Sequence, residues 1–367
     1  MTVRVPYLDL AAQHRPLKPQ LLAAIERVLD HGQFILGPEV NELEQRLASA
    51  LGVPHVVGVS NGTDALVLAL KLAGVGPSDE VITVSHSFVA TASAICLVGA
   101  RPVFVDIDDA TMTMDPSLVE RAWTPRTRAV LPVHLNGFPA AVEPLAEICA
   151  RRGAALIEDC AQAIGARVKG RSVGTHGLGC FSLHPLKVLS ACGDAGFITV
   201  PTAEQAAALR RMRNLGLVDR DHCDTIDSNM RLDTLQAAML LVKLERLSSY
   251  VEARRAHAAA YRAGLKDVVT LPPDDGANTQ VYSAFVVRHE RRDALRAFLA
   301  ERGIDAKIHY PIPIHRQRAF GAWAATPLPV TDRTCARILS LPVTPELGAA
   351  QRDEVIDAIR TFGATAS

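Results

Sequence analysis

A single lysine stands in the middle of a nearly apolar stretch. Residues 180–200 read CFSLHPLKVLSACGDAGFITV, in which Lys187 is the only lysine and Asp194 the only acid. Lysine is rarely buried without a partner. An apolar pocket would lower the pKa of Lys187 and free its amine as a nucleophile. The alternative is that the aliphatic stem runs along the protein and the ammonium reaches water.

Two acids close a predicted strand upstream of that lysine. In ALIEDC (155–160), Glu158 and Asp159 follow three apolar residues. The carboxyl ends of strands in open α/β sheets are where ligands bind. A buried carboxylate there needs a cationic or proton-donating partner. The alternative is that it caps the turn that follows.

A third feature is SNGTDAL (60–66), which joins a predicted strand to an apolar helix. Thr63 or Asp64 can cap that helix, and its free N–H groups and dipole would bind a phosphate-sized anion. An ordinary capped turn is the alternative. No Walker loop and no G-x-G-x-x-G is present.

A fourth feature is IHYPIPIHRQ (308–317), a proline-stiffened loop with two histidines. It lacks an acid or cysteine close by in sequence, so we predict no metal site there. Together, an anion site, a strand-end acid and an activatable lysine are what a pyridoxal phosphate (PLP) enzyme requires, because its cofactor needs a phosphate anchor, a carboxylate for the pyridine nitrogen and a Schiff-base lysine.

Alternating strands and helices position these residues. Short β-branched runs predict buried strands, and apolar segments ending on glycine predict helices between them. The strands are expected at 55–60, 80–85, 101–107, 128–135, 154–160, 180–184 and 196–200, and the helices at 17–32, 39–52, 63–74, 88–99, 142–153 and 203–214. This order predicts a mainly parallel sheet covered on both faces.

A second, smaller unit is expected toward the C-terminus. A long helical stretch begins near Asn229, and an α+β pattern follows at 281–289, 292–303, 304–310 and 351–362. We therefore predict two domains, 1–245 and 246–367.

Composition excludes several classes of protein. The 367 residues carry 39 basic and 39 acidic side chains, so no basic surplus favours nucleic acid. The longest apolar run, 90–100, is too short to span a membrane, and the N-terminus has no secretory signal. Seven scattered cysteines without C-x-x-C predict reduced thiols. We expect a cytoplasmic enzyme.

Over nearly its whole length the chain resembles the DegT/DnrJ/EryC1/StrS family of PLP-dependent sugar aminotransferases. The matching motifs are GQFILGPEV (32–40), SNGTDAL (60–66), SHSFVATASAI (85–95), PVHLNG (132–137), EDCAQAIGA (158–166), FSLHPLK (181–187), GDAG (193–196), SNMRLDTLQAA (228–238), HYPIPIHRQ (309–317) and LSLPVTPEL (339–347). The resemblance implies an aspartate-aminotransferase-like α/β fold (fold type I), with a mainly parallel seven-stranded sheet and a smaller C-terminal α+β domain.

The resemblance also implies roles for individual residues. Lys187 would bind the cofactor and move the proton, Asp159 would pair with the pyridinium nitrogen, and His184 lies near the lysine. The implied cofactor contacts are Gln162 at the ring oxygen, Phe88 on the ring face, Gly62, Thr63 and Ser182 at the phosphate, and Asn229 from the neighbouring subunit of a homodimer. His309 and Tyr310 would face the sugar.

The implied reaction moves an amino group from glutamate or glutamine to a keto-sugar, expected to be a nucleoside-diphosphate-linked 3-keto or 4-keto sugar in amino-sugar biosynthesis. Alternatives are a free cyclic ketone such as a keto-inositol, a PLP-dependent sugar dehydratase, or a non-catalytic regulatory homologue. The chain departs from the family pattern at Phe34, Asn136, Ala195 and Ser228. These departures affect the expected sugar pocket and leave the cofactor residues intact.

Overall fold

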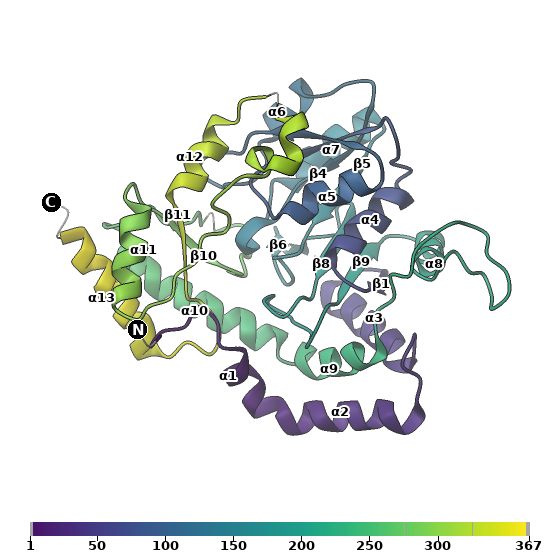
Figure 1. Cartoon of the computed structure of the whole chain (residues 1–367), viewed down its shortest axis with the longest axis horizontal. Helices are drawn as coiled ribbons and strands as arrows, with labels where there is room; N and C mark the ends of the chain where they lie inside the picture. The colour runs from purple at the N-terminus through teal and green to yellow at the C-terminus, as the bar shows by residue number, and fades with distance from the viewer. Residues whose placement is uncertain (1–2, 275, 325, 365–367) are drawn as a thin grey trace.

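The computed structural model describes residues 3–274, 276–324 and 326–364. Its centre is a seven-stranded sheet in the order β1-β9-β8-β5-β4-β2-β3 (Figure 1). The strands are β1 (His55–Val59), β2 (Glu80–Val84), β3 (Arg101–Val105), β4 (Thr127–Leu131), β5 (Ala155–Asp159), β8 (Leu178–Ser182) and β9 (Gly196–Val200). Only β9 runs against its neighbours, so the sheet is mainly parallel, as predicted.

Helices cover both faces of this sheet, which is why its strands are apolar on both sides. One face packs against α4 (Gly62–Leu72), α5 (Val89–Leu97) and α8 (Ala203–Met212). The other packs against α3 (Pro38–Leu51), α6 (Pro116–Arg121), α7 (Val142–Arg152) and α9 (Thr234–Leu244). Ahead of α3 lie α1 (Leu10–His14) and α2 (Lys18–His31), and α2 packs on α9.

The C-terminal part forms a smaller α+β unit with its own core. It pairs β10 (Phe285–Arg288) with β11 (Ile338–Leu341) and adds α10 (Leu247–Leu265), α11 (Arg292–Glu301) and α13 (Ala349–Ala364). Val5 joins this core and bridges to Ile304, so the start of the chain packs on the small unit. The fold expected from the sequence is confirmed.

Several local predictions were wrong. The long helix expected from Asn229 is broken: α9 starts at Thr234 and ends at Leu244, and α10 starts at Leu247. Residues 304–310 make isolated bridges instead of a strand. The short hairpin β6 (Arg167–Val168) and β7 (Arg171–Ser172) and the strand β11 were missed, since short pairs carry little periodicity.

The 246–367 division stays a prediction, and part of that range lies on the large unit. The segment with η3 (Ile314–Arg316), η4 (Arg318–Trp323) and α12 (Pro329–Arg337) contacts β3 and α5. Asp106, after β3, accepts hydrogen bonds from the N–H groups of Val330 and Thr331 at the start of α12. Within the described residues, no helix is both long and apolar enough to cross a membrane.

Candidate active site

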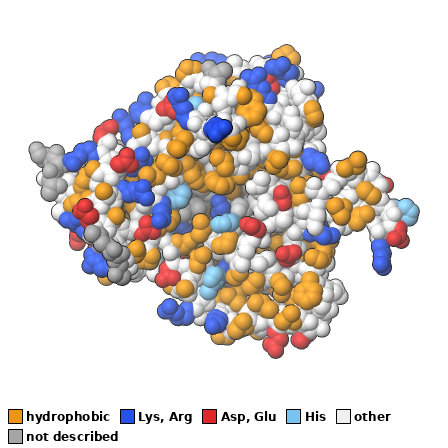
Figure 2. Space-filling view, viewed as in Figure 1, with side chains coloured by type: hydrophobic (Ala, Val, Ile, Leu, Met, Phe, Trp, Pro, Cys, Tyr) orange, Lys and Arg blue, Asp and Glu red, His pale blue; other side chains and the backbone are white. Residues whose placement is uncertain are grey.

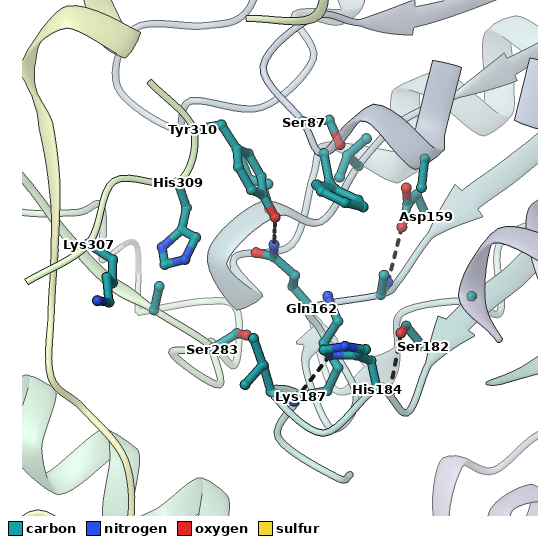
Figure 3. A pocket seen from close by; sticks show the side chains of 18 of the residues that line it. Ser87, Asp159, Gln162, Ser182, His184, Lys187, Ser283, Lys307, His309 and Tyr310 are labelled. Carbon is teal, nitrogen blue, oxygen red and sulfur yellow. Dashed lines mark hydrogen bonds between the residues drawn. The ribbon is translucent and has the colours of Figure 1, made fainter. Parts of the chain in front are cut away.

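A cavity of about 1260 Å³ lies at the carboxyl ends of β5 and β8. Its walls come from the large unit, the small unit and the N-terminal segment around Tyr7. Lys187, Asp159, Ser182 and Gln162 all line it, so segments far apart in the sequence meet here (Figure 3). The lysine and the strand-end acid singled out in the sequence therefore share one cavity.

Lys187 lies in the turn after β8 and is half-buried. Burial lowers the pKa of its amine, and the nearby Asp159 carboxylate opposes that shift. The loop that carries it is closed by backbone bonds from Leu183 N to Ala195 O (2.8 Å) and from Ala191 N to Leu183 O (2.7 Å). Beneath it, the buried Lys243 of α9 donates to Ser190 O at 2.7 Å. The Lys187 amine is thus held on an anchored loop.

Asp159 is the last residue of β5 and is 4% exposed. Its Oδ2 accepts from Thr91 Oγ1 at 2.8 Å and its Oδ1 from Ala161 N at 3.1 Å. Burial raises the pKa of this carboxyl, while those hydrogen bonds and Lys187 counteract the rise. A cationic group placed beside it would stabilise the ionised form.

The turn between β1 and α4 forms a cradle against the end of β8. A Cβ added to Gly62 would lie 2.7 Å from Ser182 Cβ, so only glycine allows this approach. The helix N-terminus supplies N–H groups without intrahelical partners, next to the Ser182 hydroxyl. Thr63 also lines the cavity.

The predicted cap of this helix was wrong. Asn61, not Thr63 or Asp64, is the N-cap, and its side chain accepts from Asp64 N at 2.8 Å. Asp64 instead accepts hydrogen bonds from Ser60 and Asn61. The helix therefore begins at Gly62, one residue earlier than expected.

Aromatic and amide side chains form another part of the cavity wall. Gln162 accepts from Asn136 N at 2.7 Å and donates to the Tyr310 hydroxyl at 3.1 Å. Phe88 is 53% exposed and its ring lies 5.6 Å from that of Tyr310. Burial and Asp159 raise the pKa of Tyr310 to about 12, so its phenol stays protonated.

His309 comes from the same loop as Tyr310 and lines the cavity. Its Nδ1 lies 2.9 Å from Ser340 Oγ. Burial and the neighbouring Lys187 and Lys307 lower the pKa of His309 to about 4, so the imidazole is neutral at neutral pH.

Of the two remaining expected site residues, His184 lies at the cavity and Asn229 does not. His184 is exposed and lines the cavity, and its Nδ1 accepts from Leu186 N at 3.3 Å. Asn229 is exposed and is not among the described residues that line the cavity. It lies in the extended segment before α9, bridged to Asn214.

Three residues of the site escaped the sequence analysis. Thr91, which binds Asp159, lies one helical turn after Phe88, and that spacing was its only signal. Tyr7 reaches the cavity from the N-terminal segment. Arg254 is 3% exposed and donates to Tyr282 O and Ser283 O. Neither Tyr7 nor Arg254 has a local pattern that reveals its place.

Known proteins are similar to this chain in sequence and in fold over nearly its whole length. Residues 16–360 match the DegT/DnrJ/EryC1/StrS aminotransferase family. The dTDP-3-amino-3,4,6-trideoxy-alpha-D-glucose transaminase of Streptomyces venezuelae is 43% identical, covering 98% of this chain and 97% of the relative. The UDP-N-acetyl-3-dehydro-alpha-D-glucosamine 3-aminotransferase of Acidithiobacillus ferrooxidans is 41% identical, covering 97% of each. The crystal structure of S. venezuelae DesV superposes with a TM-score of 0.96 at 43% identity, covering 99% of each chain.

Proposed function

Because this chain belongs to the DegT/DnrJ/EryC1/StrS aminotransferase family, we propose that it transfers an amino group from glutamate or glutamine to the 3-keto group of a nucleoside-diphosphate-linked sugar. The single observation that carries the reaction class is the shared cavity of Lys187 and Asp159. The choice of C3 is supported by the relatives, of which one is named for a dTDP-3-amino sugar and another for a UDP-3-dehydro sugar.

The cofactor is PLP, and the cavity fits it. The Gly62–Ser182 approach leaves a cradle that a side chain at residue 62 would fill. We propose that Gly62, Thr63 and Ser182 hold the phosphate, that Asp159 pairs with the pyridine nitrogen, and that Gln162 binds the ring oxygen. Phe88, which is half-exposed to the cavity, would lie against the ring.

When bound, PLP supplies an aldehyde for the amine and a ring that withdraws electrons from the reacting carbon. Lys187 holds the cofactor between turnovers. Its lowered pKa makes the free amine available, so it removes the proton from Cα of the donor. In the second half-reaction it returns a proton to C3 of the sugar. His184, at the cavity wall beside the lysine, is proposed to assist from the solvent side.

The sugar is proposed to bind on the side of the cavity formed by His309 and Tyr310. Both residues line it, and both are neutral at neutral pH. A neutral imidazole and a neutral phenol can donate to and accept from sugar hydroxyl groups. Figure 3 shows them across the cavity from Lys187.

A homodimer is proposed as the working form, with Asn229 of each subunit reaching the cofactor phosphate of the other. Apolar side chains gather on the surface over α2 and α9 (Figure 2). Exposed members near this surface are Leu22, Leu29, Phe34 and Ile35. The projecting segment between α8 and α9 adds the fully exposed Ile226. Apolar patches of this kind mark interaction sites.

We propose that the enzyme works in the cytoplasm. All seven cysteines are free thiols. Proteins of reducing compartments keep their cysteines in that form.

The alternatives have less support. A sugar dehydratase of this family commonly replaces the Schiff-base lysine by histidine, whereas Lys187 is present here and lines the cavity. A purely regulatory homologue would have no need to keep Lys187, Asp159 and Gln162 together. The assay described below distinguishes a free cyclic ketone from a nucleotide sugar as the acceptor.

The test begins with absorbance and proceeds to product. The purified protein with PLP should show the visible band of a lysine-bound cofactor and form an amino sugar from labelled glutamate and a 3-keto nucleotide sugar, read by mass spectrometry. Lys187→Ala should lose the band and at least about 100-fold in turnover. Lys169→Ala, at an exposed lysine paired with Glu143, is the control and should retain both. A colourless wild type that ignores PLP would contradict the proposal, and amination of a keto-inositol alone would replace its acceptor.

A further inference from the structure

A buried contact joins the loop that bears His309 and Tyr310 to the central sheet. Ser85, directly after β2, is 0% exposed, and its Oγ lies 2.7 Å from His315 Nδ1. The same Oγ accepts from His315 N at 2.9 Å, and Ser85 O accepts from Ile314 N at 3.0 Å. Three hydrogen bonds thus connect residues about 230 positions apart in the chain.

Ser85 Oγ contacts both the backbone and the ring of His315. The hydroxyl accepts from His315 N and can donate its own proton to Nδ1, an arrangement in which the imidazole proton lies on Nε2. Nε2 lies 3.3 Å from Asp332 Oδ1, whose carboxylate is held mainly by Arg316. Burial lowers the pKa of His315, against the pull of Asp332, so the neutral ring fits this arrangement.

The contact lies outside the cavity but is directly continuous with its walls. Ser85 and His315 are not among the described residues that line the cavity. Phe88, three residues after Ser85, lines it and faces Tyr310, whose hydroxyl binds Gln162. The connection from β2 to α5 therefore meets the 309–315 loop twice, once at Ser85 and once at Phe88.

Apolar packing does not replace this connection. Ile314 is buried with Ala92 and Phe104, which holds the loop near the sheet. Packing is non-directional and would tolerate a rotated or shifted loop. The paired hydrogen bonds of His315 give the loop one orientation, and with it the direction in which His309 and Tyr310 face.

We propose that His315, through Ser85, is a positioning residue for the sugar half-reaction. It touches neither cofactor nor substrate, and acts by fixing the loop that presents His309 and Tyr310 to the acceptor. The inference rests on the proposed function, because it assigns these two residues to the sugar side.

The ping-pong reaction allows the two halves to be measured separately. In His315→Ala, the absorbance of bound PLP and the single-turnover rate with glutamate should stay within about twofold of wild type. The KM for the 3-keto nucleotide sugar should rise about tenfold, since a net hydrogen bond of ordinary strength is lost. His315→Asn, whose amide oxygen can accept from Ser85, should recover most of the loss.

Ser85→Ala should reproduce the effect, and the double variant should be no worse than either single variant, because both remove the same contact. Thr331→Val is the matched control: it removes a buried hydrogen bond to Asp106 that ties α12 to the sheet, and should leave both half-reactions unchanged. Equal losses in both half-reactions, additive effects, or no rescue by asparagine would overturn the inference. A wild type that fails the glutamate half-reaction would instead count against the proposed function.

Discussion

Two neighbouring carboxylates at the end of β5 differ in their hydrogen-bond partners and in their access to the cavity. Glu158 is 0% exposed and accepts from His176 N, Gly177 N and Gly174 N at 2.8 to 2.9 Å, and from His134 Nε2 at 3.1 Å. Among the described residues, the Asp159 side chain accepts only from Thr91 and Ala161, and it lines the cavity. One acid is fully satisfied by the fold, and the other retains capacity for a ligand.

The pKa shifts of the two acids follow from these partners. Burial by itself would raise the pKa of both. At Glu158 the hydrogen bonds from His134 and the backbone N–H groups outweigh burial, and its pKa is lowered. At Asp159 burial outweighs the hydrogen bonds from Thr91 and Ala161 and the nearby Lys187, and the pKa is raised. Glu158 thus stabilises the fold, whereas Asp159 is free to bind a positively charged ring.

The largest expected effect, on turnover, comes from removing the negative charge of Asp159. Asp159→Asn keeps the size and can still bond Thr91 and Ala161, but it cannot stabilise a protonated pyridine. We expect turnover to fall about 100- to 1000-fold. Steady-state amination assays measure this, with unfolding curves as the control for structure. Turnover close to wild type would remove Asp159 from the reaction.

A smaller effect, on stability, is expected at its neighbour. In Glu158→Gln one carboxylate oxygen becomes an NH₂ group that faces donors, so a buried donor loses its partner. The free energy of unfolding should fall by about 1–3 kcal/mol, measured by urea unfolding. PLP absorbance of the folded fraction should be retained. If Glu158→Gln abolished cofactor binding while the protein remained equally stable, the division between the two acids would be wrong.

The smallest effect is a pH dependence of opposite sign at the two acids, in protein freed of PLP. A lowered pKa gives stability that is present above the ordinary carboxylate pKa and is lost as pH falls, which applies to Glu158. A raised pKa gives stability that is lost as pH rises, which applies to Asp159. Cofactor-free Asp159→Asn should therefore gain stability relative to wild type as pH rises above the ordinary aspartate pKa of about 4. Parallel urea curves at each pH test the sign, and a constant difference would contradict it.

Much of this site could be predicted because its residues lie at strand ends. Lys187, Asp159, Ser182 and Gly62 each follow or close a clearly apolar strand or precede an apolar helix. The carboxyl ends of parallel strands meet at one edge, so these residues had to converge. Resemblance to a family added Gln162 and Phe88, which no periodicity singles out, and both line the cavity.

Other features could not be predicted from local patterns. The helices α9 and α10 are separated at residues 245–246, although the helical pattern of the sequence continues there without interruption. Asn61 caps α4 although Thr63 and Asp64 are equally good capping types, because the turn geometry decides which side chain can reach back. Ser85 and His315 had no visible relation, since contacts across 230 positions leave no trace in spacing.

The order of strands and helices, the family and the choice of Lys187 as the candidate for the reactive lysine followed from the sequence itself, because hydrophobic periodicity and motif spacing are local properties. The apolar patterns left open which of the two adjacent acids faces the cavity. The resemblance implied Asp159, and the tertiary structure places Asp159, and not Glu158, among the described residues that line it. Successive strand residues point to opposite faces, and both faces of this sheet are covered, so periodicity does not tell which face holds the ligand. In the structure, α5 brings Thr91 to Asp159, and the 174–177 loop folds over Glu158.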